Sequence, residues 1–169
     1  MKRVAKLLKE MIDAGIITNY AVFGAVAQMR YTEAIVTLYA DILIAVPDTS
    51  LPDILSPIYA FCREKGYFPD GEAIRVGDWP VQFLPAFNPL TEEAMAQADV
   101  ADLEGIPLRA VRAGYLAVIA LSVGRAKDFT RILALQEAGA VEDEEVSKIA
   151  DRHGLFKEWQ TFRRRFHEV

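Results

Sequence analysis

Two residues in the first third of the chain, Gly24 and Asp41, stand where a site for a phosphate group could form. Gly24 follows the apolar run Tyr20–Phe23, and Asp41 comes just ahead of the apolar run Ile42–Val46. Because glycine tolerates a sharp turn and a close approach of the backbone, Gly24 is a candidate ligand-facing turn. A helix that begins there would offer free N–H groups to a phosphate, and Asp41 would hold a metal ion beside it.

The segment around these residues resembles the nucleotidyltransferase fold, and in particular the small bacterial AbiEii-toxin-like group. The likeness rests on Gly24, Ala25, Thr37 and Asp41, and it continues in order through Tyr31–Ala34, Val81–Ala94 and Tyr115–Ile132. The resemblance implies an α/β (α+β) fold, with a nucleotidyltransferase-like mixed sheet flanked by helices and a helical C-terminal part.

The resemblance also implies a function, namely transfer of a nucleotide from a nucleoside triphosphate to a protein, RNA or small-molecule acceptor. Such transfer develops charge on phosphate oxygens, and two divalent ions held by carboxylates commonly neutralise it. Mg²⁺ or Mn²⁺ would be the cofactor of an active enzyme. AbiEii-type relatives act in toxin–antitoxin or defence systems, so the resemblance further implies a partner protein of the antitoxin kind.

The metal-binding pattern of that family is incomplete in this chain. Two aspartates at positions i and i+2 of a strand point to the same face, but here Tyr39 occupies the first position and only Asp41 remains. Gln82 stands where a third carboxylate commonly lies, and Glu33 would substitute only if its linker folds back. The pattern predicts a weak or absent metal site. It leaves open an enzyme, a catalytically inactive relative that binds nucleotide or a partner protein, and an interaction domain without ligand.

A second resembling motif runs from Gly124 to Asp128 and carries two basic residues. The resemblance puts Arg125 or Lys127 near triphosphate oxygens. Alternatively, Arg125 and Asp128 form a salt bridge, because residues three apart on a helix meet on one face. The sequence therefore predicts one catalytic and metal-binding residue, Asp41, and five nucleotide-binding residues: Gly24, Ala25, Thr37, Arg125 and Lys127.

Composition limits the classes of partner. The chain has 169 residues, is 52% hydrophobic and carries a formal net charge of −5, which argues against a nucleic-acid footprint over the whole surface. RNA contact is therefore expected only from a local patch, for which Arg163–Arg165 between Phe162 and Phe166 is the candidate; a charged final helix is the alternative. The lone Cys62 excludes an internal disulfide and is expected to be an inert core thiol.

No apolar stretch is long enough to span a membrane, and the first ten residues lack the features of a signal peptide, so a cytoplasmic location without membrane contact is expected. Apolar periodicity and turn residues predict the elements. Helices are expected over 4–12, 24–29, from Ser50 or Asp53 to Gly66, from residue 91, and from 113 to the end; strands over 20–23 and 42–46; hairpins over 73–85 and 101–111. Residues 1–111 would form the α/β core and 112–169 a helical part packed on it as one unit.

Overall fold

The computed structural model describes residues 1–33 and 37–167 of the chain; Ala34, the last residue of one resembling motif, lies outside them. The described residues form a mixed sheet with the strand order β3-β4-β5-β2-β1-β7-β6. Its strands are β1 (Asn19–Phe23), β2 (Ala40–Ala45), β3 (Pro69–Asp70), β4 (Ala73–Val76), β5 (Trp79–Pro85), β6 (Asp99–Leu103) and β7 (Ile106–Ala110). The helices are α1 (Lys2–Asp13), α2 (Gly24–Gln28), α3 (Ser56–Glu64), α4 (Pro89–Ala96), α5 (Ala113–Val123), α6 (Ala126–Glu137), α7 (Asp143–Arg152) and α8 (Phe156–Phe166).

The centre of the sheet is built from strands that are distant in sequence. β1 pairs antiparallel with β2 and parallel with β7, and β2 pairs parallel with β5. Parallel neighbours need a crossover connection, and helices supply it here. The predicted mixed sheet flanked by helices is confirmed.

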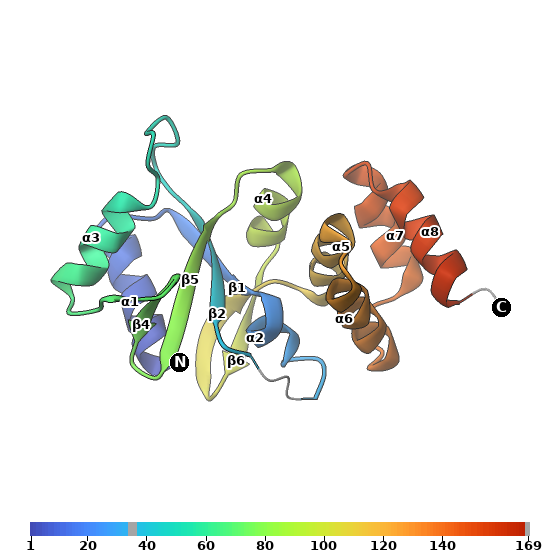
Figure 1. Cartoon of the computed structure of the whole chain (residues 1–169), viewed down its shortest axis with the longest axis horizontal. Helices are drawn as coiled ribbons and strands as arrows, with labels where there is room; N and C mark the ends of the chain where they lie inside the picture. Colours follow the sequence, from blue (N-terminus) through green and yellow to red (C-terminus); the bar gives the residue numbers. More distant parts are fainter. Residues whose placement is uncertain (34–36, 168–169) are drawn as a thin grey trace.

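The two faces of the sheet are covered by different helices. Figure 1 shows α1 and α3 on one side of the strands, and α2 and α4 on the other, toward the C-terminal helices. Because side chains alternate along a strand, Ala40 and Ile42 of β2 point to one face, while Asp41 points to the other. Ala40 and Ile42 are fully buried, whereas Asp41 is only partly buried. Because of this alternation, Asp41 lies on the face of the sheet that α2 covers.

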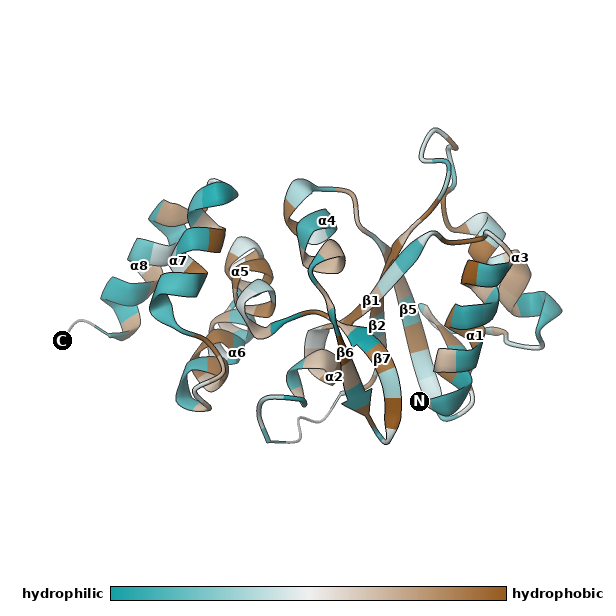
Figure 2. Ribbon diagram, turned by 180° about the vertical axis from the view of Figure 1, so that it is seen from behind, coloured by the Kyte–Doolittle hydropathy of each residue, from teal (hydrophilic) through white to brown (hydrophobic). Residues whose placement is uncertain are grey.

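Apolar spacing explains how the helices dock. In α1, Val4, Leu7, Leu8 and Met11 are buried at intervals of three and four residues, as an amphipathic helix requires. Nearly every residue of α5 is buried, so this helix forms the centre of the C-terminal half. In Figure 2 the ribbons of α7 and α8 are largely hydrophilic, whereas α5 and parts of the central strands are hydrophobic. Cys62 is buried as expected, and burial raises the pKa of its thiol to about 12.

Several boundaries differ slightly from the sequence predictions. β2 begins at Ala40, two residues before the apolar run Ile42–Val46, so the expected strand carries Asp41. The carboxylate of Asp53 accepts hydrogen bonds from the backbone of Leu55 and Ser56, which accounts for the start of α3. α4 begins at Pro89 instead of near Thr91, because the side chain of Asn88 caps it. The hairpin over 73–85 is confirmed, with its turn at Gly77.

The C-terminal helices are tied to the α/β half by a polar cluster as well as by apolar packing. Glu93 of α4 receives a hydrogen bond from Arg152 at 3.1 Å and lies 2.6 Å from Nε2 of His153. Arg152 also lies 3.3 Å from the hydroxyl of Tyr115 in α5. The division of the chain at residue 111 remains a prediction. Over the described ranges, no helix combines the length and the apolar character that a membrane crossing requires.

Candidate functional site

Gly24 and Asp41 lie in direct contact at the end of β1. The antiparallel register pairs Phe23 with Asp41, so the residue after Phe23 passes beside the carboxylate. Gly24 has a φ of +65°, and a Cβ built on it would lie 2.6 Å from Oδ2 of Asp41. Only glycine adopts this backbone conformation readily and leaves room for the carboxylate. The two residues on which the sequence prediction depends are thus brought together.

Ala25 follows Gly24 in the first turn of α2 and is almost completely buried. α2 has only five residues, so few peptide dipoles add up at its N-terminus. The observed contribution of Gly24 is therefore the space it leaves beside Asp41.

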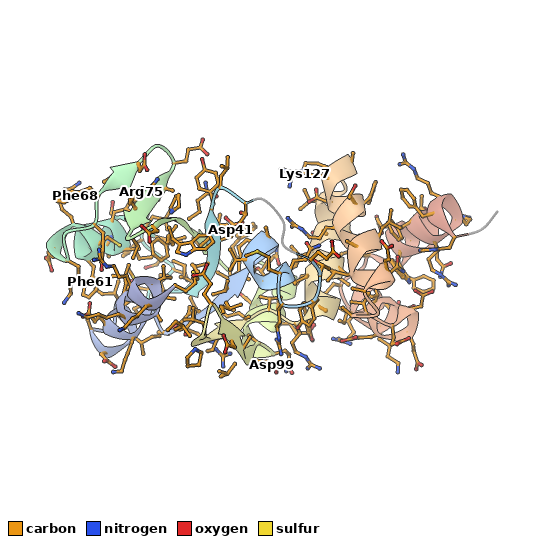
Figure 3. All side chains as sticks on the ribbon, turned by 90° about the horizontal axis from the view of Figure 1, so that it is seen from below. Asp41, Phe61, Phe68, Arg75, Asp99 and Lys127 are labelled. Atoms are coloured by element: carbon orange, nitrogen blue, oxygen red, sulfur yellow. The ribbon has the colours of Figure 1, made fainter. Side chains whose placement is uncertain are left out.

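Asp41 sits in an electrostatically unusual position. Burial raises the pKa of its carboxyl above the ordinary aspartate value, while the positive charges of Arg131 and Lys127 act in the opposite direction. Figure 3 shows Asp41 on the sheet and Lys127 across from it on the helical half. A buried carboxylate is stabilised by opposite charges, so the cations of α6 help Asp41 stay ionised.

Lys127 and Arg131 are one turn apart on α6, and both are close enough to act on Asp41. Lys127 was among the predicted residues, whereas Arg131 was not. The spacing i, i+4 that puts it on the same side as Lys127 was readable in the sequence. Arg131 also acts on Asp128, the partner of Arg125. Counted together, Arg125, Lys127 and Arg131 still exceed the two carboxylates by one positive charge, which suits an anionic ligand.

Arg125 has a different environment from Lys127. It is the N-cap residue of α6, and its Nε donates to Oδ2 of Asp128 at 2.7 Å. Asp128 is 2% exposed and also accepts a hydrogen bond from the backbone N–H of Arg125. Burial acts to raise the pKa of Asp128, but the hydrogen bonds from Arg125 outweigh it and hold that pKa below its usual range. The salt-bridge alternative therefore describes the contacts of Arg125 in this structure.

Thr37 and Tyr39 lie just before β2. The hydroxyl of Thr37 donates to the backbone carbonyl of Tyr39 at 2.8 Å, so it fixes the local turn. Thr37 lines a cavity next to the N-terminus of α1, a separate environment from the contact of Gly24 with Asp41. Tyr39 is half-buried.

Gln82 is the neighbour of Asp41 on the adjoining strand. The parallel pairing of β2 with β5 puts Asp41 opposite Gln82 in register. The amide oxygen of Gln82 is an uncharged ligand and binds Mg²⁺ weakly. Within residues 1–33 and 37–167, no three His, Cys, Asp or Glu side chains gather as a metal site would need. Glu33 is exposed and forms no such group with Asp41.

Known proteins were compared with this chain by sequence and by structure. No protein-family model matches the sequence, and no curated protein matches it significantly. The solution structure of the antibiotic-resistance factor ANT(2'')-Ia aligns with a TM-score of 0.54 over 99% of this chain and 97% of that one. The chain has the nucleotidyltransferase fold.

At 14% sequence identity, the likeness to ANT(2'')-Ia establishes this fold alone. A crystal structure of ANT(2'')-Ia in complex with adenylyl-2''-tobramycin also aligns, with 14% identity over 96% of each chain, but its TM-score of 0.45 is too low to support an argument. The nucleotidyltransferase fold accounts for the order of the elements here.

Proposed function

We propose that this protein binds a nucleoside triphosphate beside Asp41 and transfers its nucleotide to an acceptor. The observation that carries the proposal is the contact between Gly24 and Asp41, in which a glycine turn leaves space for a carboxylate that two cations face. Phosphoryl and nucleotidyl transfer depend mainly on positioning and on neutralising charge at phosphate oxygens. Lys127 and Arg131 would neutralise those oxygens, and Gly24 would let the backbone approach them.

The donor set around Asp41 fits one divalent cation better than two. Asp41 supplies one carboxylate and Gln82 a neutral amide, whereas a pair of ions about 3.5–4 Å apart needs several carboxylates. Magnesium is commonly held by one or two carboxylates together with phosphate oxygens. When bound with a triphosphate, Mg²⁺ or Mn²⁺ would supply further positive charge at the phosphates, and Asp41 would orient it.

A second candidate function, binding without transfer, is favoured by one observation. The half-buried phenol of Tyr39 stands where the resembling family has an aspartate, and it cannot act as a hard anionic ligand. A relative of this kind would bind nucleotide or a partner protein and leave it unchanged. For both candidate functions, we further propose a role in a toxin–antitoxin or defence system with an antitoxin-like partner. This part of the proposal is supported by the family resemblance.

The first experiment is thermal melting with ATP, GTP, CTP or UTP, each with and without Mg²⁺ or Mn²⁺. A triphosphate at a hundred times its Kd should add about 2.7 kcal/mol of stability. For a chain of this size, that gain raises Tm by about 5–10 °C. If none of the four triphosphates raises Tm, nucleotide transfer and nucleotide binding are both refuted.

The second experiment separates transfer from binding. The protein is incubated with each α-labelled triphosphate and with total RNA, a protein extract or a mixture of hydroxyl-bearing small molecules. Label that becomes attached to one acceptor class supports transfer and identifies that class. A metal-dependent rise in Tm without attached label supports binding only. Asp41→Asn should abolish the signal, and Asp151→Asn, which removes an exposed carboxylate from α7, is the matched control.

A further inference from the structure

A cavity among the described residues lies away from the contact between Gly24 and Asp41. Its volume is about 750 Å³, within the range of about 300–1,000 Å³ that small-molecule sites occupy. It is bounded by the first turn of α1, the residues before β2, the β4–β5 turn and the β6–β7 turn. The residues that matter for its chemistry are Lys2, Arg3, Arg75, Asp78, Trp79 and Glu104.

This cavity lies at the end of the sheet where α1 begins, and Gly24, Asp41, Lys127 and Arg131 are not among its lining residues. Trp79 and Val81 alternate with Gln82 along β5, so Trp79 points away from the face that carries Asp41. Figure 1 shows α1 on the opposite side of the strands from α2. A ligand in the cavity would therefore contact a different set of side chains from a triphosphate at Asp41.

Arg3 is held at the cavity wall by a close packing contact. Gly77 in the β4–β5 turn has a φ of +63°, and a Cβ on it would lie 3.0 Å from Cδ of Arg3. The stem of Arg3 thus lies across the backbone of the turn at a place where only glycine leaves room. Arg3 is exposed, so its guanidinium is accessible to a ligand in the cavity.

Two more side chains of the wall are fixed by hydrogen bonds. Asp70 accepts from Nε and Nη2 of Arg75 at 2.9 and 2.7 Å, which holds the guanidinium plane. Glu104 accepts from Nε1 of Trp79 at 3.4 Å and from the Met1 nitrogen at 3.0 Å. This hydrogen bond favours one orientation of the half-exposed indole of Trp79, which lines the cavity.

The charges of the wall favour an anion. Among the described residues, no carboxylate forms an ion pair with Lys2 or Arg3, whereas Glu104 is already paired with the Met1 nitrogen. Asp78 is the remaining acidic residue of the wall. We propose that this cavity is a second ligand site, which takes a small molecule with a planar ring and an anionic group. The ring would stack on Trp79, and Lys2 and Arg3 would contact the anion.

Adenosine monophosphate is a suitable probe, because it combines a planar base with a phosphate and lacks the triphosphate proposed for the other site. Trp159 is fully buried, so quenching of tryptophan fluorescence reports on Trp79. Adenosine monophosphate should quench the emission saturably in the whole protein. Adenosine alone and inorganic phosphate alone should each bind more weakly. The Trp79→Phe variant should lose the response.

Two double variants test the role of charge. Lys2→Gln/Arg3→Gln should weaken binding of adenosine monophosphate roughly tenfold, as expected for loss of charge-assisted hydrogen bonds. Lys6→Gln/Arg164→Gln removes the same charge from exposed positions outside the cavity and should bind like the unchanged protein. An equal Kd in the two double variants, with far-UV circular dichroism unchanged, would overturn the proposal, as would the absence of saturable quenching.

The Asp41→Asn variant separates this site from the proposed triphosphate site. Quenching of Trp79 by adenosine monophosphate should persist in Asp41→Asn, even where the metal-dependent response to triphosphate is lost. Conversely, Lys2→Gln/Arg3→Gln should keep the metal-dependent response to triphosphate. If Asp41→Asn abolishes the quenching, the nucleotide binds at Asp41 and the second site is refuted. Failure of either site is thus visible without failure of the other.

Discussion

A Cβ placed on Gly24 would lie 2.6 Å from Oδ2 of Asp41, so the turn and the carboxylate cannot be varied independently. Gly24→Ala should therefore lose stability through the positive φ, by about 1–2 kcal/mol, and through the clash with Asp41. Gly15→Ala is the matched control, because Gly15 has a similar φ of +71° and nothing within 4 Å of the new methyl group. Denaturant unfolding should show a larger loss for Gly24→Ala, together with a weaker response to triphosphate. Equal losses for both variants would show that the contact with Asp41 is unimportant.

Asp41→Asn should raise the stability of the protein at neutral pH. Burial raises the pKa of Asp41, so the folded state binds its proton more tightly than the unfolded state does. The ionised carboxylate therefore destabilises the folded state, and this destabilisation grows as pH rises from the ordinary aspartate pKa to the raised pKa of the folded state. Urea unfolding at acid and neutral pH should give an advantage of Asp41→Asn that is largest at neutral pH and vanishes in acid. An advantage that grows as pH falls would contradict the assignment.

Lys127→Gln and Arg131→Gln should each weaken triphosphate binding roughly tenfold, because each removes a charge-assisted contact with phosphate. Both changes should also raise the pKa of Asp41 further, since the two cations lower it in the folded protein. Arg164→Gln on α8 serves as the control, because Arg164 is exposed and absent from the groups that act on Asp41. Calorimetric titration measures the Kd, and NMR titration measures the pKa. Unchanged values for both variants would remove α6 from the site.

Tyr39→Asp should strengthen metal-dependent binding or transfer. Residue 39 lies immediately before β2, and if it continues the alternation of the strand, a carboxylate there would face the same side as Asp41, so both could share a cation. The hydrogen bond from Thr37 goes to the backbone carbonyl of residue 39 and does not depend on the phenol. Mg²⁺ titration in the presence of triphosphate is the measurement, with Tyr39→Asn as the uncharged control. If both variants bind Mg²⁺ alike, position 39 is not directed at the metal.

Glu93→Gln should make stability less sensitive to acid. The pKa of Glu93 lies below its usual value, mainly because of the hydrogen bond from His153, and the hydrogen bonds from Arg152 lower it further. A depressed folded pKa gives stability that is present above the unfolded glutamate pKa and is lost as pH falls through the folded pKa. Since Glu93 is partly exposed, the contribution should be no more than about 1 kcal/mol. Urea unfolding between acid and neutral pH measures it, and an unchanged slope would contradict the role of this cluster.

Much of the fold was predictable because its signals are local. The apolar spacing in Val4–Met11, the short run before Gly24 and the hairpin around Gly77 each determine one element without help from distant residues. Boundaries were less accurate where a side chain decided them. The acidic pair after Thr91 had indicated a helix start at Thr91, whereas the cap formed by Asn88 starts α4 two residues earlier, at Pro89.

The candidate site was only partly predictable, because its members come from separate elements. Gly24 and Asp41 were paired from the glycine turn and the acid at the next apolar run, and the register of β1 with β2 brings them together. Arg131 was missed although its spacing from Lys127 was visible, since a helix surface alone does not indicate which strand it faces. The contact between Glu93 and His153 likewise joins residues sixty positions apart in the chain, which the sequence alone does not bring together.

The position of β1 has a consequence for synthesis of the chain. β1 lies between β2 and β7, and β7 is not complete until residue 110. A fragment released before that point would expose one edge of β1 with its backbone groups unpaired, a known template for intermolecular pairing. Proteolytic or engineered fragments that stop before β6 should therefore self-associate, whereas fragments that include the β6–β7 hairpin should have that edge protected.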